Sequence, residues 1–271
     1  MSKKPIIVFE GIEGSGKSHH ISIVSKYLKN NKIDFLKIRE PGGNSNSEKI
    51  RKIILSNKSN FNKNTDLLLY MAARSENISQ IRKYFHKKII LIDRFTDSTI
   101  AYQHYGMGVN INLIKILNKF LLKNIKVDFT FLNLVNNRNL YDRLKKRKSL
   151  NRYDKFNMKF YNKVQRGFVK LSNINKRKYQ LINSNLNIEN NDLFIENIRK
   201  LGSNRITRIE LPLKKYNEEI GMKGSGIILF NGSNFLINNM KDCVKELFQI
   251  FESGLIKSNN LRRISKIVYS Q

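Results

Sequence analysis

The sequence predicts an α/β protein in which five parallel strands form a sheet flanked by helices, followed by a small α+β appendage at the C-terminus. Two observations carry this prediction. Short apolar runs, typical of strands buried on both faces, alternate with longer segments whose apolar residues recur every three to four positions. Strands that alternate with helices in this way pair in parallel through right-handed crossovers.

Five segments have the pattern of strands. They are Pro5–Glu10, Ile33–Arg39, Lys88–Asp93, Val127–Leu134 and Tyr179–Asn183. The first is apolar from Ile6 to Phe9 without a break, as expected for a strand that is buried on both faces.

The segments between these strands have helical spacing. They are the stretch that contains Ile21, Val24 and Leu28, then Ser45–Leu55, Asp66–Tyr84, Ile111–Leu122, Asn136–Lys148, Asn157–Leu171 and Asp192–Leu201. A basic segment, Lys145–Asp154, separates two of these helices and has the character of a hinge. We therefore expect one domain over residues 1–201.

The pattern changes after Gly202. Residues 206–213 alternate as in a strand, Gly226–Phe230 and Phe235–Ile237 predict a hairpin across Asn231 and Gly232, and Met240–Phe251 has helical spacing. Residues 202–271 are thus expected to form an appendage, in which no residue pattern indicates chemistry.

Composition limits the class of protein. Of 271 residues, 40% are hydrophobic, including 16 Phe and 11 Tyr, which is enough for a core and excludes a disordered basic tail. The single cysteine, Cys243, excludes an internal disulfide and fits a reducing compartment. Neither a signal-peptide core nor a run of about 20 apolar residues is present, so we expect a soluble, cytoplasmic protein.

A glycine-rich segment carries the strongest chemical signal. Gly11-Ile12-Glu13-Gly14-Ser15-Gly16-Lys17-Ser18 satisfies the pattern G-x-x-x-x-G-K-[ST], after a predicted strand and before a predicted helix. In such a phosphate-binding loop (P-loop), backbone N–H groups surround phosphate oxygens, Lys17 reaches the β and γ phosphates, and Ser18 can bind Mg²⁺. The sequence therefore predicts a P-loop NTPase fold that binds a nucleoside triphosphate.

Two arginines indicate a second, anionic ligand. Arg39 ends the second predicted strand and Arg94 follows the third, at the carboxyl ends of strands, where parallel sheets bind ligands. A planar guanidinium can bind a phosphate through two hydrogen bonds. Either arginine alone is more often part of a surface ion pair, but both beside a P-loop predict a phosphorylated acceptor.

Six stretches taken together resemble the bacterial thymidylate kinase family. They are FEGIEGSGKS at the P-loop, REPGG at 39–43, LLLYMAAR ending at Arg74, DRFTDSTIAYQ from Asp93 to Gln103, VDFTFLNL in the fourth strand, and Arg143–Phe168, a lid with its following helix. They span residues 5 to about 200 in the order and spacing of the family. The resemblance implies in-line transfer of a phosphoryl group from ATP, with Mg²⁺, to dTMP, giving dTDP for dTTP synthesis, in a homodimer.

The resemblance also implies roles for single residues. Tyr70 would stack on the thymine ring, Arg74 would bond the carbonyl edge of the base, and Tyr102 would crowd the ribose 2′ position. Asp93 and Ser18 would arrange Mg²⁺. The full set implied to bind dTMP is Arg39, Tyr70, Arg74, Arg94, Ser98, Thr99, Tyr102 and Gln103.

The lid is the other implied source of arginines. Family members whose P-loop lacks an arginine carry basic residues in the lid, and here the lid has Arg143, Arg147 and Arg152. An arginine close to the transferred phosphoryl group can accelerate transfer by about 10³-fold or more. The predicted catalytic residues are Lys17, Arg94, Arg147 and Arg152.

The net charge of +30, from 51 basic and 21 acidic residues, has two possible explanations. Compositional bias towards Lys, together with the need to hold anionic nucleotides, is one, and a role with nucleic acid is the other. Residues 1–201 contain 40 basic and 15 acidic residues, so the excess follows the predicted kinase domain rather than a tail.

Two other functions therefore stay open: a kinase for another nucleoside monophosphate or a deoxynucleoside and, from a different class, a P-loop ATPase that acts on nucleic acid. Because no RNA-binding signature of basic and aromatic residues is present, no nucleic-acid partner is expected, and neither is a membrane partner.

Overall fold

The computed structural model describes residues 4–147, 149–185, 226–230 and 233–237. The chain divides into two compact units, Met1–Ile195 and Glu196–Gln271. The predicted division at residue 201 stays a prediction, as does the predicted helix Asp192–Leu201, which lies outside the described residues.

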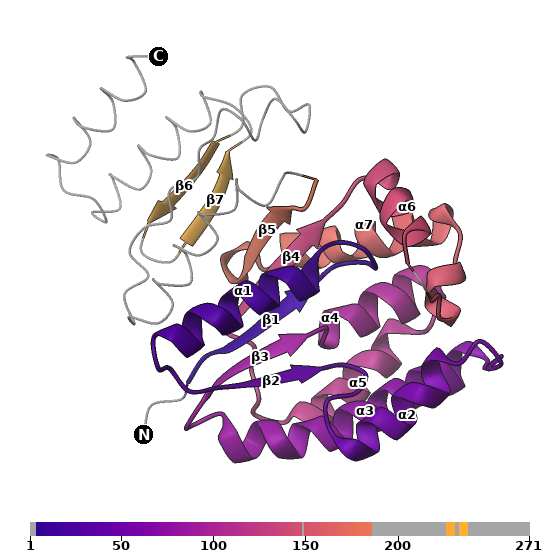
Figure 1. The fold of residues 1–271 in the computed structure, drawn as a ribbon, viewed down its shortest axis with the longest axis horizontal. Coiled ribbons are helices and arrows are strands. Elements are labelled where there is room, and N and C mark those ends of the chain that lie inside the picture. Colours follow the sequence, from indigo (N-terminus) through magenta and orange to yellow (C-terminus); the bar gives the residue numbers. More distant parts are fainter. Residues whose placement is uncertain (1–3, 148, 186–225, 231–232, 238–271) are drawn as a thin grey trace, which may run out of the picture. The chain divides into compact units, whose positions relative to one another are not determined.

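The first unit contains a five-stranded sheet, as predicted (Figure 1). Its strands are β1 (Ile6–Glu10), β2 (Phe35–Arg39), β3 (Ile89–Asp93), β4 (Phe129–Leu134) and β5 (Tyr179–Asn183). They pair in parallel in the order β2-β3-β1-β4-β5. All five strands therefore end at the same edge of the sheet, where the loops that follow them meet.

Six longer helices join these strands, close to their predicted bounds. They are α1 (Lys17–Asn30), α2 (Ser45–Leu55), α3 (Lys63–Tyr84), α5 (Ile111–Leu122), α6 (Asn137–Lys145) and α7 (Met158–Ile174). Helix α3 begins three residues earlier than predicted and α6 ends three residues earlier. The short helix α4 (Thr96–Thr99) and the π-helix Ile100–Gly106 that continues it were not predicted, nor were the 3₁₀ turns Arg152–Lys155 and Lys176–Lys178.

Asparagine side chains begin most of these helices. An asparagine precedes each of five helices and its side chain accepts a hydrogen bond from a backbone N–H of the first turn: Asn44, Asn62, Asn110, Asn136 and Asn157. Such a cap contributes about 0.5–2 kcal/mol relative to alanine. The high asparagine content of the chain therefore helps to define where its helices start.

No helix in the described ranges is long and apolar enough to cross a membrane.

The core lies on both faces of the sheet. On one face, Ile6 and Val8 of β1 pack with Ile78 and Ile81 of α3, and α7 packs beside Leu132 of β4. Figure 1 shows α1 in front of β1 and β3, and α7 behind β4. The apolar residues of β1 are 2% exposed or less, which confirms that this strand is buried on both faces.

The described part of the second unit is a hairpin. Strand β6 (Gly226–Phe230) pairs antiparallel with β7 (Ser233–Ile237), with Phe230 opposite Ser233, so the two residues between them are the predicted Asn231 and Gly232. The predicted strand at 206–213 and the predicted helix Met240–Phe251 lie outside the described residues.

Candidate active site

A cavity of about 410 Å³ opens where β1, β2 and β3 end. The P-loop forms one part of its wall, and residues from the end of β2, from α2, α3, the β3–α4 region and the lid form the rest. Its lining residues from outside the P-loop include Glu40, Pro41, Arg51, Leu55, Tyr70, Arg74, Asp93, Arg94, Phe95, Ser98, Thr99, Tyr102, Gln103, Arg147, Asn151 and Tyr153.

The P-loop has the backbone that its glycines predict. Gly11 has φ 138°, and a Cβ at this position would lie 2.5 Å from the backbone oxygen of Asn133. Only glycine therefore fits here. The loop curls round Lys17, whose Nζ donates to the backbone oxygens of Gly11, at 2.9 Å, and Ile12, at 2.8 Å.

Burial and the neighbouring Arg94 lower the pKa of Lys17 to about 7. A phosphate group at this position would favour the charged ammonium form, because opposite charges at close range raise the pKa of a base. The Lys17 side chain is thus held where an anionic ligand would stabilise its positive charge.

Arg94 lines the cavity. Its Nη2 pairs with Glu13 Oε1 at 2.8 Å, its Nη1 donates to the Gly11 oxygen at 2.8 Å, and its guanidinium stacks 5.1 Å from the ring centroid of Tyr102. Although burial acts to raise the pKa of Glu13, Arg94 and Lys17 hold it below its ordinary value. The phenol of Tyr102 donates to the other oxygen of Glu13.

The backbone of Arg94 is strained. Its φ of 66° is in the left-handed region, which costs a non-glycine residue about 1 kcal/mol or more. The backbone N–H bonds the Phe9 oxygen of β1 at 3.0 Å and so holds this conformation. An arginine that lines the cavity and contacts both the P-loop and Tyr102 is consistent with the predicted role of Arg94 at the acceptor phosphate.

Glu10, which the sequence analysis did not single out, positions helix α4. Its carboxylate accepts hydrogen bonds from the backbone N–H of Phe95, at 2.9 Å, and of Ser98, at 3.2 Å, and from the Ser98 hydroxyl. Burial and the nearby Asp97 raise the pKa of Glu10 to about 7. The sequence signal that could have indicated this role is a glutamate at the end of a strand that is otherwise apolar.

Arg74 is the largest fully buried side chain near the cavity, with 1% exposure. Its hydrogen-bond acceptors are Glu40 Oε2 (2.8 Å), Asn118 Oδ1 (2.7 Å), Met71 Sδ (3.8 Å), the Phe95 oxygen (2.9 Å) and Thr99 Oγ1 (2.9 Å). These five contacts equal the number of N–H groups that a guanidinium has. In this structure Arg74 therefore joins the end of β2 to α4 and α5, and a bond to a base would require one of these contacts to open.

Seven of the eight residues implied to bind dTMP line the cavity, and Arg39 does not. The Arg39 side chain is 51% exposed and pairs with Glu48 at 2.9 Å. Arg51 of α2 lines the cavity instead, and its Nη1 donates to the Pro41 oxygen at 2.6 Å. Its position one residue after the partly buried Ile50 and three before the buried Ile54 is a weak helical signal for an inward-facing arginine.

The structure separates the three lid arginines. Arg147 lines the cavity and pairs with Asp154. Arg152 does not line it, because its guanidinium pairs with the buried Asp66. Arg143 donates to the Gly14 oxygen at 2.8 Å and so braces the outer side of the P-loop.

The two residues implied to arrange Mg²⁺ share the cavity. Ser18 and Asp93 both line it, and Asp93 Oδ1 is buried without a hydrogen bond from any described residue. Oxygen atoms are the ligands that Mg²⁺ prefers, so these two fit the ion together with nucleotide phosphates. In the described ranges no group of three or more His, Cys, Asp or Glu residues could hold a metal by itself.

Comparison with known proteins finds thymidylate kinases. The family model "Thymidylate kinase" matches residues 9–195. A thymidylate kinase from Thermosipho africanus is 38% identical over 186 residues, which are 68% of this chain and 92% of that protein. A second thymidylate kinase, from Kosmotoga olearia, is 32% identical over 68% of this chain and 89% of its own.

Among solved structures, the thymidylate kinase from Ehrlichia chaffeensis is similar to this chain, with a TM-score of 0.55 and 31% identity. The match covers 67% of this chain and 93% of that one. The family model covers more than half of the chain and includes every described residue of the cavity wall. By the family model and by these relatives, this chain belongs to the thymidylate kinase family.

Proposed function

We propose that this protein transfers the γ-phosphoryl group of ATP to dTMP, forming ADP and dTDP. One observation carries the proposal beyond family membership: a single cavity has Lys17 of the P-loop at one part of its wall and Tyr70, Ser98 and Tyr102 at another. Donor and acceptor can therefore meet in one cavity, which Arg94 also lines.

The mechanism we propose depends on positioning and electrostatics. A dTMP phosphate oxygen attacks the γ-phosphorus in line while ADP leaves, so one P–O bond forms as another breaks and no covalent enzyme intermediate is needed. Lys17, Arg94 and Arg147 neutralise the charge that spreads over the transferred group. The lid excludes water, which would otherwise accept the phosphoryl group.

We include Mg²⁺ in the proposal because Ser18 and Asp93 offer oxygen atoms on one wall of the cavity. When bound with ATP, the ion would supply positive charge that stabilises the charge of the phosphates. The remaining chemistry belongs to the side chains: Ser18 offers its hydroxyl, and Asp93 offers a carboxylate whose charge acts on Lys17.

We also propose a cytoplasmic homodimer. Leu113, Ile116 and Phe120 lie on one face of α5 with 39%, 65% and 71% exposure, and Leu68 of the neighbouring α3 is 55% exposed. Large apolar side chains gathered on adjoining helices are typical of a surface that pairs with another copy. The single cysteine fits a reducing compartment such as the cytoplasm. Sedimentation velocity of the full chain tests the dimer directly.

The experiment that tests the activity measures ADP release from Mg-ATP by the purified full chain. The acceptors are dTMP, dUMP, dCMP, UMP and dGMP, with single-stranded DNA and no acceptor as further arms. We expect dTMP to give a kcat/KM about ten-fold or more above those of dCMP, UMP and dGMP, since unpaired polar groups penalise the wrong base. Turnover stimulated by DNA and by no monophosphate would favour the nucleic-acid ATPase instead.

A matched pair of variants shows that the P-loop is the source of the activity. Lys17→Met should abolish transfer, because it removes the charge that the P-loop holds for the phosphates. Lys26→Met, an exposed position on the same helix α1, should leave transfer unchanged. Activity in Lys17→Met would point to a contaminating kinase.

A further inference from the structure

Asp66 is a buried carboxylate that the proposed mechanism does not use. It lies in the first turn of α3 with 1% exposure. Its two oxygens accept from two consecutive residues of the lid: Oδ1 from the guanidinium of Arg152 and Oδ2 from the phenol of Tyr153. A buried carboxylate without such partners would be costly, so the lid and α3 stabilise each other here.

The lid segment has further attachments at the same place. Arg152 Nε donates to the backbone oxygen of Ile54 at 3.1 Å, at the end of α2, and its guanidinium lies 5.5 Å from the ring centroid of Phe61. Asn57 donates to the backbone oxygen of Leu150 at 2.8 Å. These contacts hold Arg152 outside the cavity, so Arg152 acts as an anchor while Arg147 faces the site.

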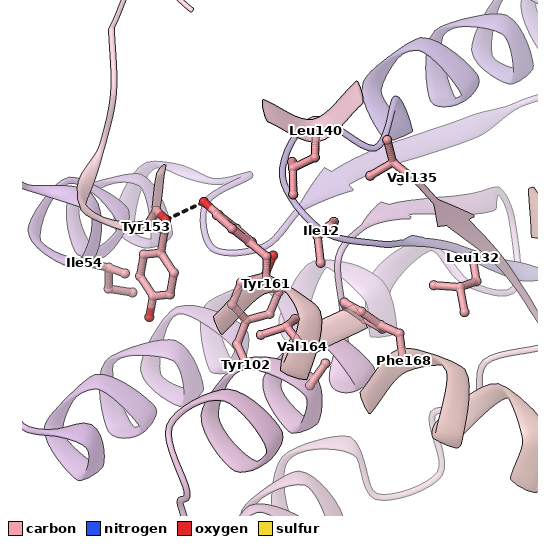
Figure 2. Close-up of a cluster of buried hydrophobic side chains, with 11 residues drawn as sticks. Ile12, Ile54, Tyr102, Leu132, Val135, Leu140, Tyr153, Tyr161, Val164 and Phe168 are labelled. Carbon is pink, nitrogen blue, oxygen red and sulfur yellow. Dashed lines mark hydrogen bonds between the residues drawn. The ribbon is translucent and has the colours of Figure 1, made fainter. Parts of the chain in front are cut away.

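The anchored segment places Tyr153 in the cavity wall. The Tyr153 side chain is almost fully buried, and its ring meets those of Tyr70 and Tyr102 edge to face, with centroids 6.0 and 5.9 Å apart. Gln103 Nε2 donates to its phenol at 3.3 Å. Figure 2 shows Tyr153 close to Ile54, with its backbone oxygen bonded to the hydroxyl of Tyr161.

Spacing along α3 connects this contact to the acceptor site. Asp66, Tyr70 and Arg74 follow one another at intervals of four residues and therefore lie along one face of the helix. The first holds the lid, whereas the second and third line the cavity. One rigid helix thus connects the position of the lid with the position of the acceptor.

We propose that Asp66 is a positioning residue for the acceptor: by binding Arg152 and Tyr153 together, it holds Tyr153 as the wall that closes the dTMP pocket. The inference rests on the proposed function, since it concerns the same site. Because coupling between two binding events is reciprocal, docking of the lid strengthens dTMP binding, and dTMP strengthens docking of the lid. ATP, which the P-loop holds from the other side, gains less from this contact.

The test compares Asp66→Asn with Asp142→Asn, an exposed carboxylate on α6. In Asp66→Asn we expect the KM for dTMP to rise about ten-fold or more, equivalent to about 1.4 kcal/mol, while the KM for ATP changes less than three-fold. Asp142→Asn should match the wild type. An unchanged dTMP KM in Asp66→Asn, or an equal rise in both KM values, would overturn the proposal.

A second variant keeps the test informative if Asp66→Asn folds poorly. Tyr153→Phe removes only the hydroxyl that contacts Asp66 and Gln103, and should raise the dTMP KM in the same direction. Arg152→Lys, which keeps the charge, should raise the KM for dTMP less than Arg152→Gln does.

Two outcomes separate this proposal from the proposed function. If Tyr153→Phe, Arg152→Lys and Arg152→Gln all had the wild-type KM for dTMP, the proposal would be wrong. If the wild type itself failed to phosphorylate dTMP, the proposed function would be wrong.

Discussion

Two arginines near the end of β2 differ in their surroundings, and this difference predicts which one binds the acceptor phosphate. Arg51 lines the cavity, whereas Arg39 is half exposed and paired with Glu48. A hydrogen bond to a charged group contributes about 1.5–3 kcal/mol, so Arg51→Gln should raise the KM for dTMP about ten-fold or more. Arg39→Gln should change it less than about three-fold, because an exposed ion pair contributes little. Steady-state kinetics at saturating ATP would refute this order if Arg39→Gln had the larger effect.

Arg74 combines a structural and a functional role. Its removal in Arg74→Ala leaves the buried Glu40 carboxylate without its charge partner, which should lower the free energy of unfolding by about 3–5 kcal/mol. We also expect kcat/KM for dTMP to fall more than ten-fold, because Arg74 holds Thr99 and the Phe95 backbone.

Urea unfolding and kinetics separate the two roles of Arg74. Adding Glu40→Gln to Arg74→Ala should recover part of the stability, since no unpaired buried charge remains, and should not recover kcat/KM. If Arg74→Ala had the same free energy of unfolding as the wild type, the ion pair between Arg74 and Glu40 would not be needed for the fold.

At this scale the sequence indicates which residues belong to local motifs, but it does not indicate which way a side chain faces where tertiary packing decides. Tyr70, Ser98 and Tyr102 follow from contiguous patterns and line the cavity, as do P-loop residues 13–18. Arg39, Arg51 and Arg152 are arginines in or beside regular elements, and nothing local distinguishes those that face the cavity from those that face a carboxylate. The orientation of α2 and of the lid, which tertiary contacts set, makes that distinction.

At the scale of the elements, Glu10 connects β1 to α4, and its contribution to the free energy of unfolding should depend on pH. The pKa of Glu10 is raised from 4.5 to about 7 by burial and by Asp97, so the folded state binds its proton more tightly than the unfolded state does. The resulting stability is complete below pH 4.5 and is lost as the pH rises through 7.

Glu10→Gln tests this link because glutamine does not titrate. The unfolding free energy of the wild type minus that of Glu10→Gln should therefore decrease between pH 5 and pH 8. Urea titrations at four pH values in this range measure the difference. A difference that stays constant with pH would mean that Glu10 keeps an ordinary pKa in the folded protein.

Element bounds were predicted best where apolar periodicity is strong. Strand β5 and helices α2 and α5 have the predicted bounds, and α3 starts earlier because Asn62 caps it. The π-helix Ile100–Gly106 has no sequence signature, since it depends on bonds such as that from Met107 N–H to the Tyr102 oxygen, at 2.9 Å. Its packing against α7 requires Gly167, where a Cβ would lie 2.5 Å from Tyr105.

At the scale of the whole molecule, the region that matches the family model contains the cavity wall as far as the structure describes it. The family model ends at residue 195, and among the described residues those that line the cavity lie between Glu13 and Tyr153. We therefore expect a chain of residues 1–201 to keep kcat/KM for dTMP within about three-fold of the full chain, as for a separate domain. Loss of activity with an intact circular dichroism spectrum would assign residues 202–271 a part in catalysis.

The positive charge is also a property of the whole molecule. Residues 1–201 carry a net charge of +25 of the total of +30, so a shortened chain keeps most of the field that attracts nucleotides. The charge alone did not distinguish a nucleotide substrate from a nucleic-acid partner, because both are polyanions. The acceptor residues around the cavity, and not the charge, favour the nucleotide.

The measurement that tests the central claim most directly follows the phosphorus atoms themselves. The full chain is incubated with Mg-ATP and dTMP, and the products are identified by ³¹P NMR. If the phosphoryl group is transferred to dTMP, we expect ADP and dTDP in equal amounts. The amount of inorganic phosphate should then be no greater than in a reaction without enzyme. ADP accompanied by an equal amount of inorganic phosphate, with dTMP unchanged, would show hydrolysis instead of transfer and would contradict the account.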